Sequence, residues 1–220
     1  MADNGSDNVV VIGLGRFGGS VAESLQKLGH EVLGIDSDEK LVQEWSEKLT
    51  HVAQADATDE EALRQLGVPD FGHAVVGIGT HIEASVLTVL ALTEVGVREI
   101  WAKAISAKHG KILASVGANH VIYPEAAMGD RVAHLITSRL IDFIEFDDGY
   151  AIAKTRPPKD AVGKSLADLG LRTQYGVTVV TIKERGQGFQ PAAPDTVLPP
   201  DCVLIVAGPT DKVTKFASKT

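Results

Sequence analysis

The chain has 220 residues, enough for one sizeable domain or for one domain and a small companion. Its net charge of −8 argues against a nucleic-acid partner, because phosphate contacts need a surface of lysine and arginine. A single cysteine excludes an internal disulfide framework, and neither a signal peptide nor an apolar stretch of ~20 residues is recognised. We therefore expect a cytoplasmic protein.

The first two-thirds of the chain alternates predicted strands with predicted helices. Strands are expected at residues 9–12, 31–35, 51–53, 74–78, 99–104 and 120–123. Helices are expected at 38–49, 59–66, 83–95 and 108–116, and another is expected around Val21, Leu25 and Leu28. Aromatic residues make up only 5% of the chain, so the interior must be mostly aliphatic. These features predict an α/β fold with a Rossmann-like, doubly wound parallel sheet.

A long helical pattern then begins at Pro124, a residue well suited to the first turn, and continues to about Ile141. Its apolar stripe includes Val132, Leu135 and Ile136, and a single Rossmann domain offers little to cover it. The stripe predicts a crossover helix that packs on another subunit or on a second domain. The alternative is a final helix that packs on its own sheet.

The pattern changes after residue 149 to strand-like alternation at 150–155 and 177–183, with short helices at 165–169 and 211–217. This predicts a small α+β lobe. We expect a nucleotide-binding Rossmann domain at residues 1–142, which includes the crossover helix from about 124, and a small C-terminal lobe at 143–220.

A glycine-rich turn, Gly13-Leu14-Gly15-Arg16-Phe17-Gly18, follows the first predicted strand and opens a helix. That context is the one in which G-x-G-x-x-G binds a nucleotide. Gly13 permits the tight turn, Gly15 lets the backbone approach a phosphate, and Gly18 lets helix and strand pack closely. The start of the helix supplies free N–H groups for phosphate.

Asp36 ends the second strand, about 20 residues after the glycines, where a carboxylate can accept from ribose hydroxyls. The same charge repels a 2′-phosphate, which excludes NADP. Ser37 follows Asp36 and is assigned to the same site.

Three later segments end strands at the edge where such sheets bind ligands. They comprise Asp56, Ala57 and Thr58, then Gly77, Ile78 and Gly79, and finally Lys103. Asp56 can accept from an adenine amino group or cap the helix that starts near Asp59, and the sequence favours neither.

Arg16 stands where many dinucleotide-binding turns have a small or apolar residue. Its guanidinium offers a fork of donors suited to a terminal phosphate, which favours a mononucleotide di- or triphosphate over NAD. A solvent-facing arginine on the first helical turn is an equally good interpretation.

These residues together resemble the RCK (KTN) domains of bacterial potassium uptake regulators. The resemblance rests on Val10–Gly18, Ile35-Asp36, Ala55–Thr58, Trp101–Ala104 and Tyr123–Glu125, and it covers nearly the whole chain. A short chain with one such unit is similar to the Ktr-type regulatory subunit.

The resemblance implies a regulator rather than an enzyme. It implies dimers that assemble into an octameric ring, which is peripheral to the inner face of the cell membrane and gates a potassium-translocating subunit. ATP would favour an active ring and ADP an inactive one. Arg16 would reach the terminal phosphate of a nucleotide in the neighbouring subunit, and Glu125 would hold Mg²⁺ or another cation beside it. From the residues alone, Glu125 reads as an acid in a first helical turn.

The family resemblance also implies a second ligand, cyclic di-AMP, bound between two C-terminal lobes. Leu166, Arg172 and Val177 are the residues that we assign to that site.

An NAD-dependent oxidoreductase or an NADH-sensing regulator is the alternative, since the glycine turn and Asp36 fit NAD(H) as well. Tyr150 and Lys154 spell the Y-x-x-x-K pair of short-chain dehydrogenases. That pair must sit on a helix, and here we predict a strand. A DNA-binding repressor is disfavoured by the acidic charge and by the lack of a helix-turn-helix pattern.

Overall fold

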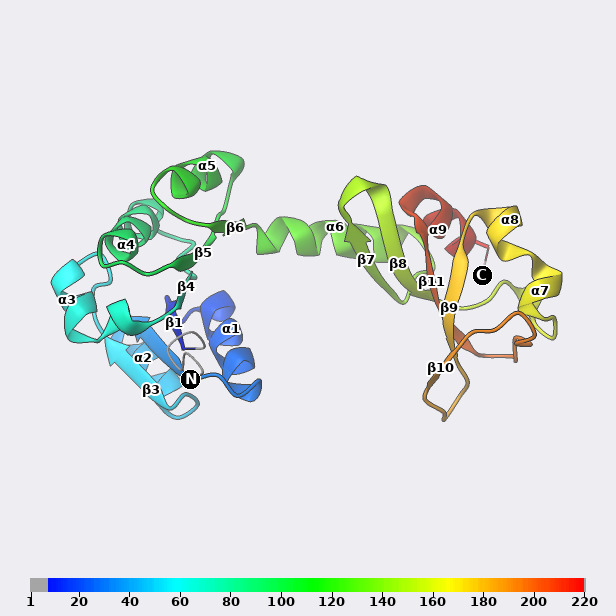
Figure 1. Cartoon of the computed structure of the whole chain (residues 1–220), viewed down its shortest axis with the longest axis horizontal. Coiled ribbons are helices and arrows are strands. Elements are labelled where there is room, and N and C mark those ends of the chain that lie inside the picture. The colour runs from blue at the N-terminus through cyan, green and yellow to red at the C-terminus, as the bar shows by residue number, and fades with distance from the viewer. Residues whose placement is uncertain (1–7, 220) are drawn as a thin grey trace, which may run out of the picture. The chain divides into compact units, whose positions relative to one another are not determined.

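The computed structural model describes residues 8–219, and its contacts divide the chain into two units. The first comprises the described residues up to Glu125 and the second begins at Ala126. The first unit contains a six-stranded parallel sheet of order β3-β2-β1-β4-β5-β6, which confirms the doubly wound prediction (Figure 1). Its strands are β1 Val9–Ile12, β2 Val32–Asp36, β3 His51–Gln54, β4 His73–Val76, β5 Glu99–Lys103 and β6 His120–Ile122.

The helices of the first unit begin where the sequence supplies capping groups. The side chains of Asp38, Asp59 and Ser106 accept backbone N–H groups at the starts of α2, α3 and α5. The helices are α1 Arg16–Lys27, α2 Glu39–Ser46, α3 Glu60–Gln65, α4 Ile82–Glu94 and α5 Ala107–Ser115, with a 3-10 turn at Val68–Asp70.

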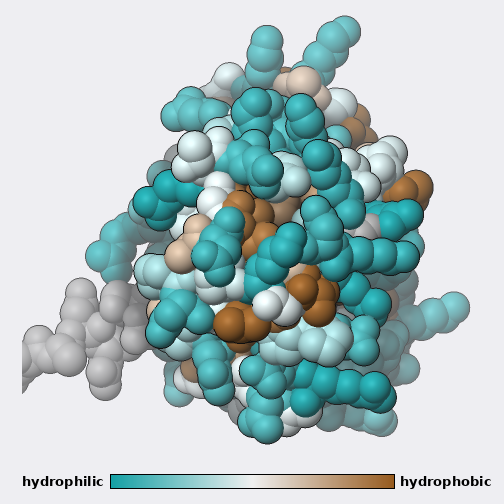
Figure 2. Space-filling model, turned by 90° about the vertical axis from the view of Figure 1, so that its right-hand side faces the viewer, coloured by the Kyte–Doolittle hydropathy of each residue, from teal (hydrophilic) through white to brown (hydrophobic). Residues whose placement is uncertain are grey.

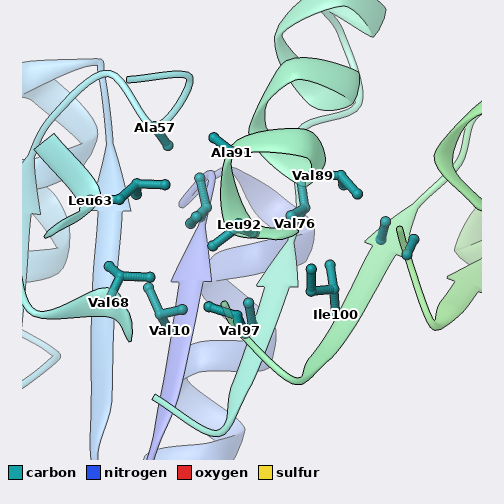
Figure 3. Packing of buried hydrophobic residues seen from close by; sticks show 14 of the residues in the cluster. Val10, Ala57, Leu63, Val68, Val76, Val89, Ala91, Leu92, Val97 and Ile100 are labelled. Atoms are coloured by element: carbon teal, nitrogen blue, oxygen red, sulfur yellow. The ribbon is translucent and has the colours of Figure 1, made fainter. Parts of the chain in front are cut away.

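The larger core of this unit lies between the sheet and helices α3, α4 and α5. Leu92 of α4 is fully buried and packs with the strand residues Val10 and Val76, which are also inaccessible to solvent (Figure 3). Each such side chain contributes about 1.5–3 kcal/mol through burial. This core fixes the strand ends from which the loops of the site emerge.

Helices α1 and α2 pack on the opposite face of the sheet, where Trp45 and Leu49 are buried. Within residues 8–125, no helix covers β5 and β6 on that face, and Trp101 is 39% exposed. The ring of Trp101 stacks on His120 with 3.8 Å between centroids. We call the apolar channel beside it the β-face groove, and its lining residues are Val9, Phe17, Val21, Leu25, His30, His73, Val75, Trp101 and Ile122.

Helix α6 spans Pro124–Thr137, so it begins as predicted but ends earlier than the expected Ile141. Strand β7, Asp142–Phe146, follows almost at once and was not predicted. Leu135 packs against the core of the second unit, whereas Val132 is 42% and Ile136 78% exposed. The predicted stripe is therefore divided between core and surface.

The second unit contains a five-stranded antiparallel sheet of order β10-β9-β11-β8-β7. Its further strands are β8 Tyr150–Thr155, β9 Thr178–Lys183, β10 Phe189–Pro191 and β11 Val203–Pro209. The helices are α7 Leu166–Leu169, α8 Leu171–Tyr175 and α9 Thr210–Ala217, and 3-10 turns lie at Asp147–Gly149 and Lys159–Ala161. The predicted small α+β lobe is thereby confirmed, although α8, β10 and β11 were not predicted.

The core of the second unit contains Cys202, Leu204, Val206 and Phe216, all fully buried. Burial raises the pKa of the Cys202 thiol, so this residue acts as a small hydrophobic side chain. Elsewhere in this unit Val180 and Phe189 are exposed, and Figure 2 shows hydrophobic side chains among hydrophilic ones on one face of the molecule.

The contact boundary at Glu125 lies near the start of α6, whereas the sequence places a domain boundary at residue 142. The role of α6 as a crossover helix stays a prediction. Among the described residues, 8–219, no helix is long and apolar enough to cross a bilayer.

Candidate functional site

The glycine turn joins β1 to α1 at the carboxyl edge of the sheet, beside the point where strand order reverses between β1 and β4. Gly13 has φ +88°, a conformation that side chains disfavour, and its N–H donates to the carbonyl of Ile35 at 2.8 Å. A Cβ on Gly18 would lie 1.9 Å from the carbonyl oxygen of Gly13. The turn and the close packing that we predicted for these two glycines are confirmed.

Gly15 differs from the other two because its surroundings are open. It is the N-cap residue of α1, and a Cβ built on it meets no atom within 4 Å. The first N–H groups of a helix lack partners within that helix. The exposed backbone at Gly15 therefore leaves space for a phosphate at the positive end of α1.

Asp36, at the end of β2, is tied to this turn by its own carboxylate. One oxygen accepts the backbone N–H of Leu14 at 2.6 Å, and the other accepts that of Asp38 at 2.9 Å. Sequence reasoning missed this structural role, although the position of the acid beside a strand-to-helix turn is its signal. Each carboxylate oxygen has a second lone pair, so Asp36 can still accept from ribose hydroxyls.

The loop after β4 lies against the same turn. A Cβ on Gly77 would be 2.9 Å from the carbonyl oxygen of Gly13, and one on Gly79 would be 3.2 Å from the ammonium nitrogen of Lys103. That nitrogen lies 5.6 Å from the ring centre of Phe17, which is on the first turn of α1. The structure therefore brings the glycine turn, the loop after β4 and Lys103 together, and a Cβ on Gly13 would lie 3.0 Å from the Ile78 side chain.

Lys103 also forms an ion pair that sequence reasoning missed. Its ammonium lies 2.5 Å from Oε1 of Glu125, in the first turn of α6. This hydrogen bond lowers the pKa of the Glu125 carboxyl, and the Arg16 guanidinium acts in the same direction. No local sequence pattern reveals this pair, because it depends on β5 and β6 being neighbours, with Lys103 opposite Ile122. Arg16 itself is exposed.

Glu125 can hold a divalent cation only together with ligands from outside its own side chain. Within residues 8–219, no group of three or more histidine, cysteine or acidic side chains could hold a metal ion. Mg²⁺ is commonly bound by one or two carboxylates together with nucleotide phosphates. A single exposed carboxylate beside a phosphate-binding turn fits that pattern.

Asp56 follows β3, and its carboxylate accepts the N–H and the hydroxyl of Thr58 at 3.0 and 2.8 Å. The backbone hydrogen bond from Thr58 is the main reason why its pKa is lowered. Asp59, and not Asp56, caps α3. The capping interpretation of Asp56 was therefore wrong. Its contact with adenine stays a prediction, as do the ligand contacts of Ala57, which is buried, and of the exposed Ser37.

The residues assigned to a second ligand lie in the second unit. Arg172 is exposed on α8, and its Nε donates to the Thr178 hydroxyl at 3.3 Å. Leu166 is half-buried, whereas Val177 is fully buried in the core. Only Arg172 of the three presents an exposed side chain, and the site itself stays a prediction.

A doubly wound sheet with this glycine turn and an acid at the end of β2 defines the class of Rossmann-type nucleotide-binding domains. The TrkA-N domain family matches residues 9–124, and the TrkA-C domain family matches residues 151–220. The chain belongs to the TrkA-N family.

Two relatives from Bacillus subtilis (strain 168) are similar over nearly their full length. Ktr system potassium uptake protein C is 36% identical over 210 residues, which are 95% of each chain. Ktr system potassium uptake protein A is 38% identical over 203 residues, which are 91% of each chain.

Among solved structures, the GsuK RCK domain is 18% identical with a TM-score of 0.67, and it shows the same fold over the whole chain. The present chain spans only 49% of that chain. A GsuK channel structure described as bound to NAD is 18% identical with a TM-score of 0.64, and the match covers 96% of the present chain and 39% of that chain. A GsuK structure described as bound to ADP is 16% identical with a TM-score of 0.52, and the match covers 64% of the present chain and 36% of that chain.

Proposed function

We propose that the protein is the nucleotide-sensing regulatory subunit of a potassium uptake system and has no catalytic activity of its own. The intact phosphate-binding turn, tied to Asp36, carries this proposal. It occurs in a chain that aligns over more than nine-tenths of its length with two Ktr system potassium uptake proteins.

The proposed regulator is a homo-oligomer, with dimers that assemble into an octameric ring, and it docks from the cytoplasm on a membrane potassium-translocating subunit. ATP and ADP would stabilise two ring shapes to different extents, because a ligand shifts an equilibrium only through its differential affinity. The cation at Glu125 would be Mg²⁺. Cyclic di-AMP, with Arg172 as its phosphate contact, is proposed as a second ligand of the C-terminal lobe.

The alternative hypothesis of an NAD-dependent oxidoreductase is disfavoured, because this fold separates its candidate catalytic pair. Tyr150 and Lys154 both lie on strand β8, where they cannot form the helical arrangement that short-chain dehydrogenases require. An NADH-sensing regulator remains the second candidate, because Asp36 would accept from the ribose of either nucleotide.

Isothermal titration calorimetry of the full chain with ATP, ADP and NADH, in the presence of Mg²⁺, tests the proposal. We expect micromolar binding of ATP and ADP and much weaker binding of NADH. Tight binding of NADH with negligible binding of ATP would overturn the ATP/ADP assignment in favour of an NADH sensor.

Arg16→Ala is expected to retain ADP binding and to lose most of the discrimination between ATP and ADP. A hydrogen bond to a charged group contributes about 1.5–3 kcal/mol, so the ratio of the two affinities should change by roughly tenfold or more. Calorimetry with both nucleotides gives this ratio. Arg98→Ala is the matched control, because Arg98 is exposed and precedes β5 at the opposite end from Lys103. The same ratio in both variants and the wild type would contradict a role for Arg16.

A further inference from the structure

The position of Lys103 is unusual for a lysine because its side chain is only 12% exposed, whereas that of its partner Glu125 is 68% exposed. Burial disfavours an ammonium group unless an anion is close. Glu125 supplies that anion at 2.5 Å, and the face of Phe17, 5.6 Å away, adds a weaker attraction. The ion pair with Glu125 therefore compensates for the burial of the Lys103 ammonium at the edge of the sheet.

The same carboxylate is the group that we propose as a ligand of the divalent cation. An ammonium at 2.5 Å from Oε1 would lie within a few ångströms of a cation bound to that carboxylate. Two positive charges at this separation repel each other, and the lysine occupies one of the two oxygens. The ion pair and the bound cation therefore compete for Glu125.

Lys103 has an alternative partner close by. Its ammonium lies beside Phe17 on the first turn of α1, and Gly15 leaves the start of this helix open to phosphate. Gly79 also adjoins the ammonium without a side chain that would restrict its movement. A lysine side chain is flexible and can carry its charge from one anion to another without moving the main chain.

We infer that Lys103 is a displaceable counter-ion, which holds Glu125 when no nucleotide is bound and moves to the terminal phosphate when a divalent cation takes Glu125. This inference rests on the proposed function and adds the way in which the site couples its two ligands. The cation separates Lys103 from Glu125, and the phosphate accepts the released ammonium. Cation and nucleotide therefore reinforce each other's binding through one side chain.

The test uses Lys103→Met in the full chain, because methionine retains much of the stem and removes the charge. The first measurement is the affinity of Mn²⁺ for the protein–ADP complex by electron paramagnetic resonance. We expect Mn²⁺ to bind at least about fivefold tighter in the variant, because no ammonium competes for Glu125. In a Glu125→Gln background, the same substitution should change Mn²⁺ affinity less than about twofold.

The second measurement is nucleotide affinity by calorimetry at saturating Mg²⁺. We expect Lys103→Met to weaken ATP by about tenfold, the effect of losing a hydrogen bond between charged groups. ADP, which lacks the terminal phosphate of ATP, should bind both proteins equally. Tighter Mn²⁺ binding with weaker ATP binding is a pair of opposite changes that a general loss of structure cannot produce, since misfolding would weaken both.

If Lys103→Met does not fold, Lys103→Arg tests the same inference. A guanidinium can hold a carboxylate through two hydrogen bonds, so Mn²⁺ should bind more weakly than to the wild type. Unchanged Mn²⁺ affinity in either folded variant, or unchanged ATP affinity in Lys103→Met, would overturn the inference. If the wild type itself binds neither ADP nor ATP, the proposed function fails, and that result is distinct from a protein that binds ATP equally well with either residue at position 103.

Discussion

Gly18→Ala is expected to lower the free energy of unfolding by about 3 kcal/mol or more, because the new methyl group overlaps main-chain atoms. Its Cβ would lie 1.9 Å from the carbonyl oxygen and 3.1 Å from the carbonyl carbon of Gly13. No side-chain rotation can relieve a contact with the main chain, so β1 and α1 must separate. Urea denaturation followed by circular dichroism measures the loss.

Gly15→Ala is the matched control for that experiment, since it adds the same methyl group to the same turn. Nothing lies within 4 Å of the added Cβ, and Gly15 has φ −64°, which alanine adopts readily. Its stability should stay within about 1 kcal/mol of the wild type, because only the weaker capping preference of alanine counts against it. Nucleotide binding should nevertheless fall, because the methyl group occupies the approach of the phosphate. Equal loss of stability in the two variants would contradict the distinct roles given to these glycines.

Asp36→Ala is expected to reduce the affinity for ADP by about a hundredfold or more. The substitution removes the acceptor for the ribose hydroxyls, and hydrogen bonds to charged groups contribute about 1.5–3 kcal/mol each. It also leaves the N–H of Leu14 without its 2.6 Å partner, which should lower the free energy of unfolding by about 1–3 kcal/mol. Calorimetry with ADP and urea denaturation measure the two effects separately.

Asp38→Asn removes one negative charge only two residues away and serves as the control. Asp38 caps α2, and asparagine caps helices about as well as aspartate. This variant should bind ADP within about twofold of the wild type. If both substitutions change ADP affinity equally, the effect of Asp36 is one of local net charge and not of direct contact with ribose.

The first unit could be predicted closely because its signals are local. Val9–Ile12 is an unbroken apolar run, as a strand buried on both faces should be, and it becomes β1. Strand β7 was missed because Asp142–Phe146 follows the helical pattern of α6 without a glycine or proline to mark the change. Its alternation becomes a strand only through pairing with β8, a contact that no local pattern reveals.

The features of the site likewise divide into those that local sequence predicts and those that depend on contacts between distant residues. The conformation of Gly13 and the close approach at Gly18 follow from a motif six residues long, so the sequence predicts them. The Lys103–Glu125 pair joins residues 22 positions apart, and only the neighbouring positions of β5 and β6 bring them together. The hydrogen bond from the Leu14 N–H to Asp36 likewise depends on how β1 and β2 pair. The sequence motif therefore predicts a role for Asp36 in ligand binding but does not reveal its structural role.

The β-face groove has a spectroscopic consequence, because the chain has two tryptophans and only one of them lines it. Trp45 is buried, and a Cβ on Gly19 would lie 2.0 Å from its ring, so its indole emission arises from apolar, closely packed surroundings. Trp101 is 39% exposed, so its emission is expected at longer wavelength. Any polypeptide that covers the groove should move the Trp101 emission toward the blue and leave that of Trp45 unchanged. The intrinsic fluorescence of the unlabelled protein therefore reports whether this face of the sheet is covered.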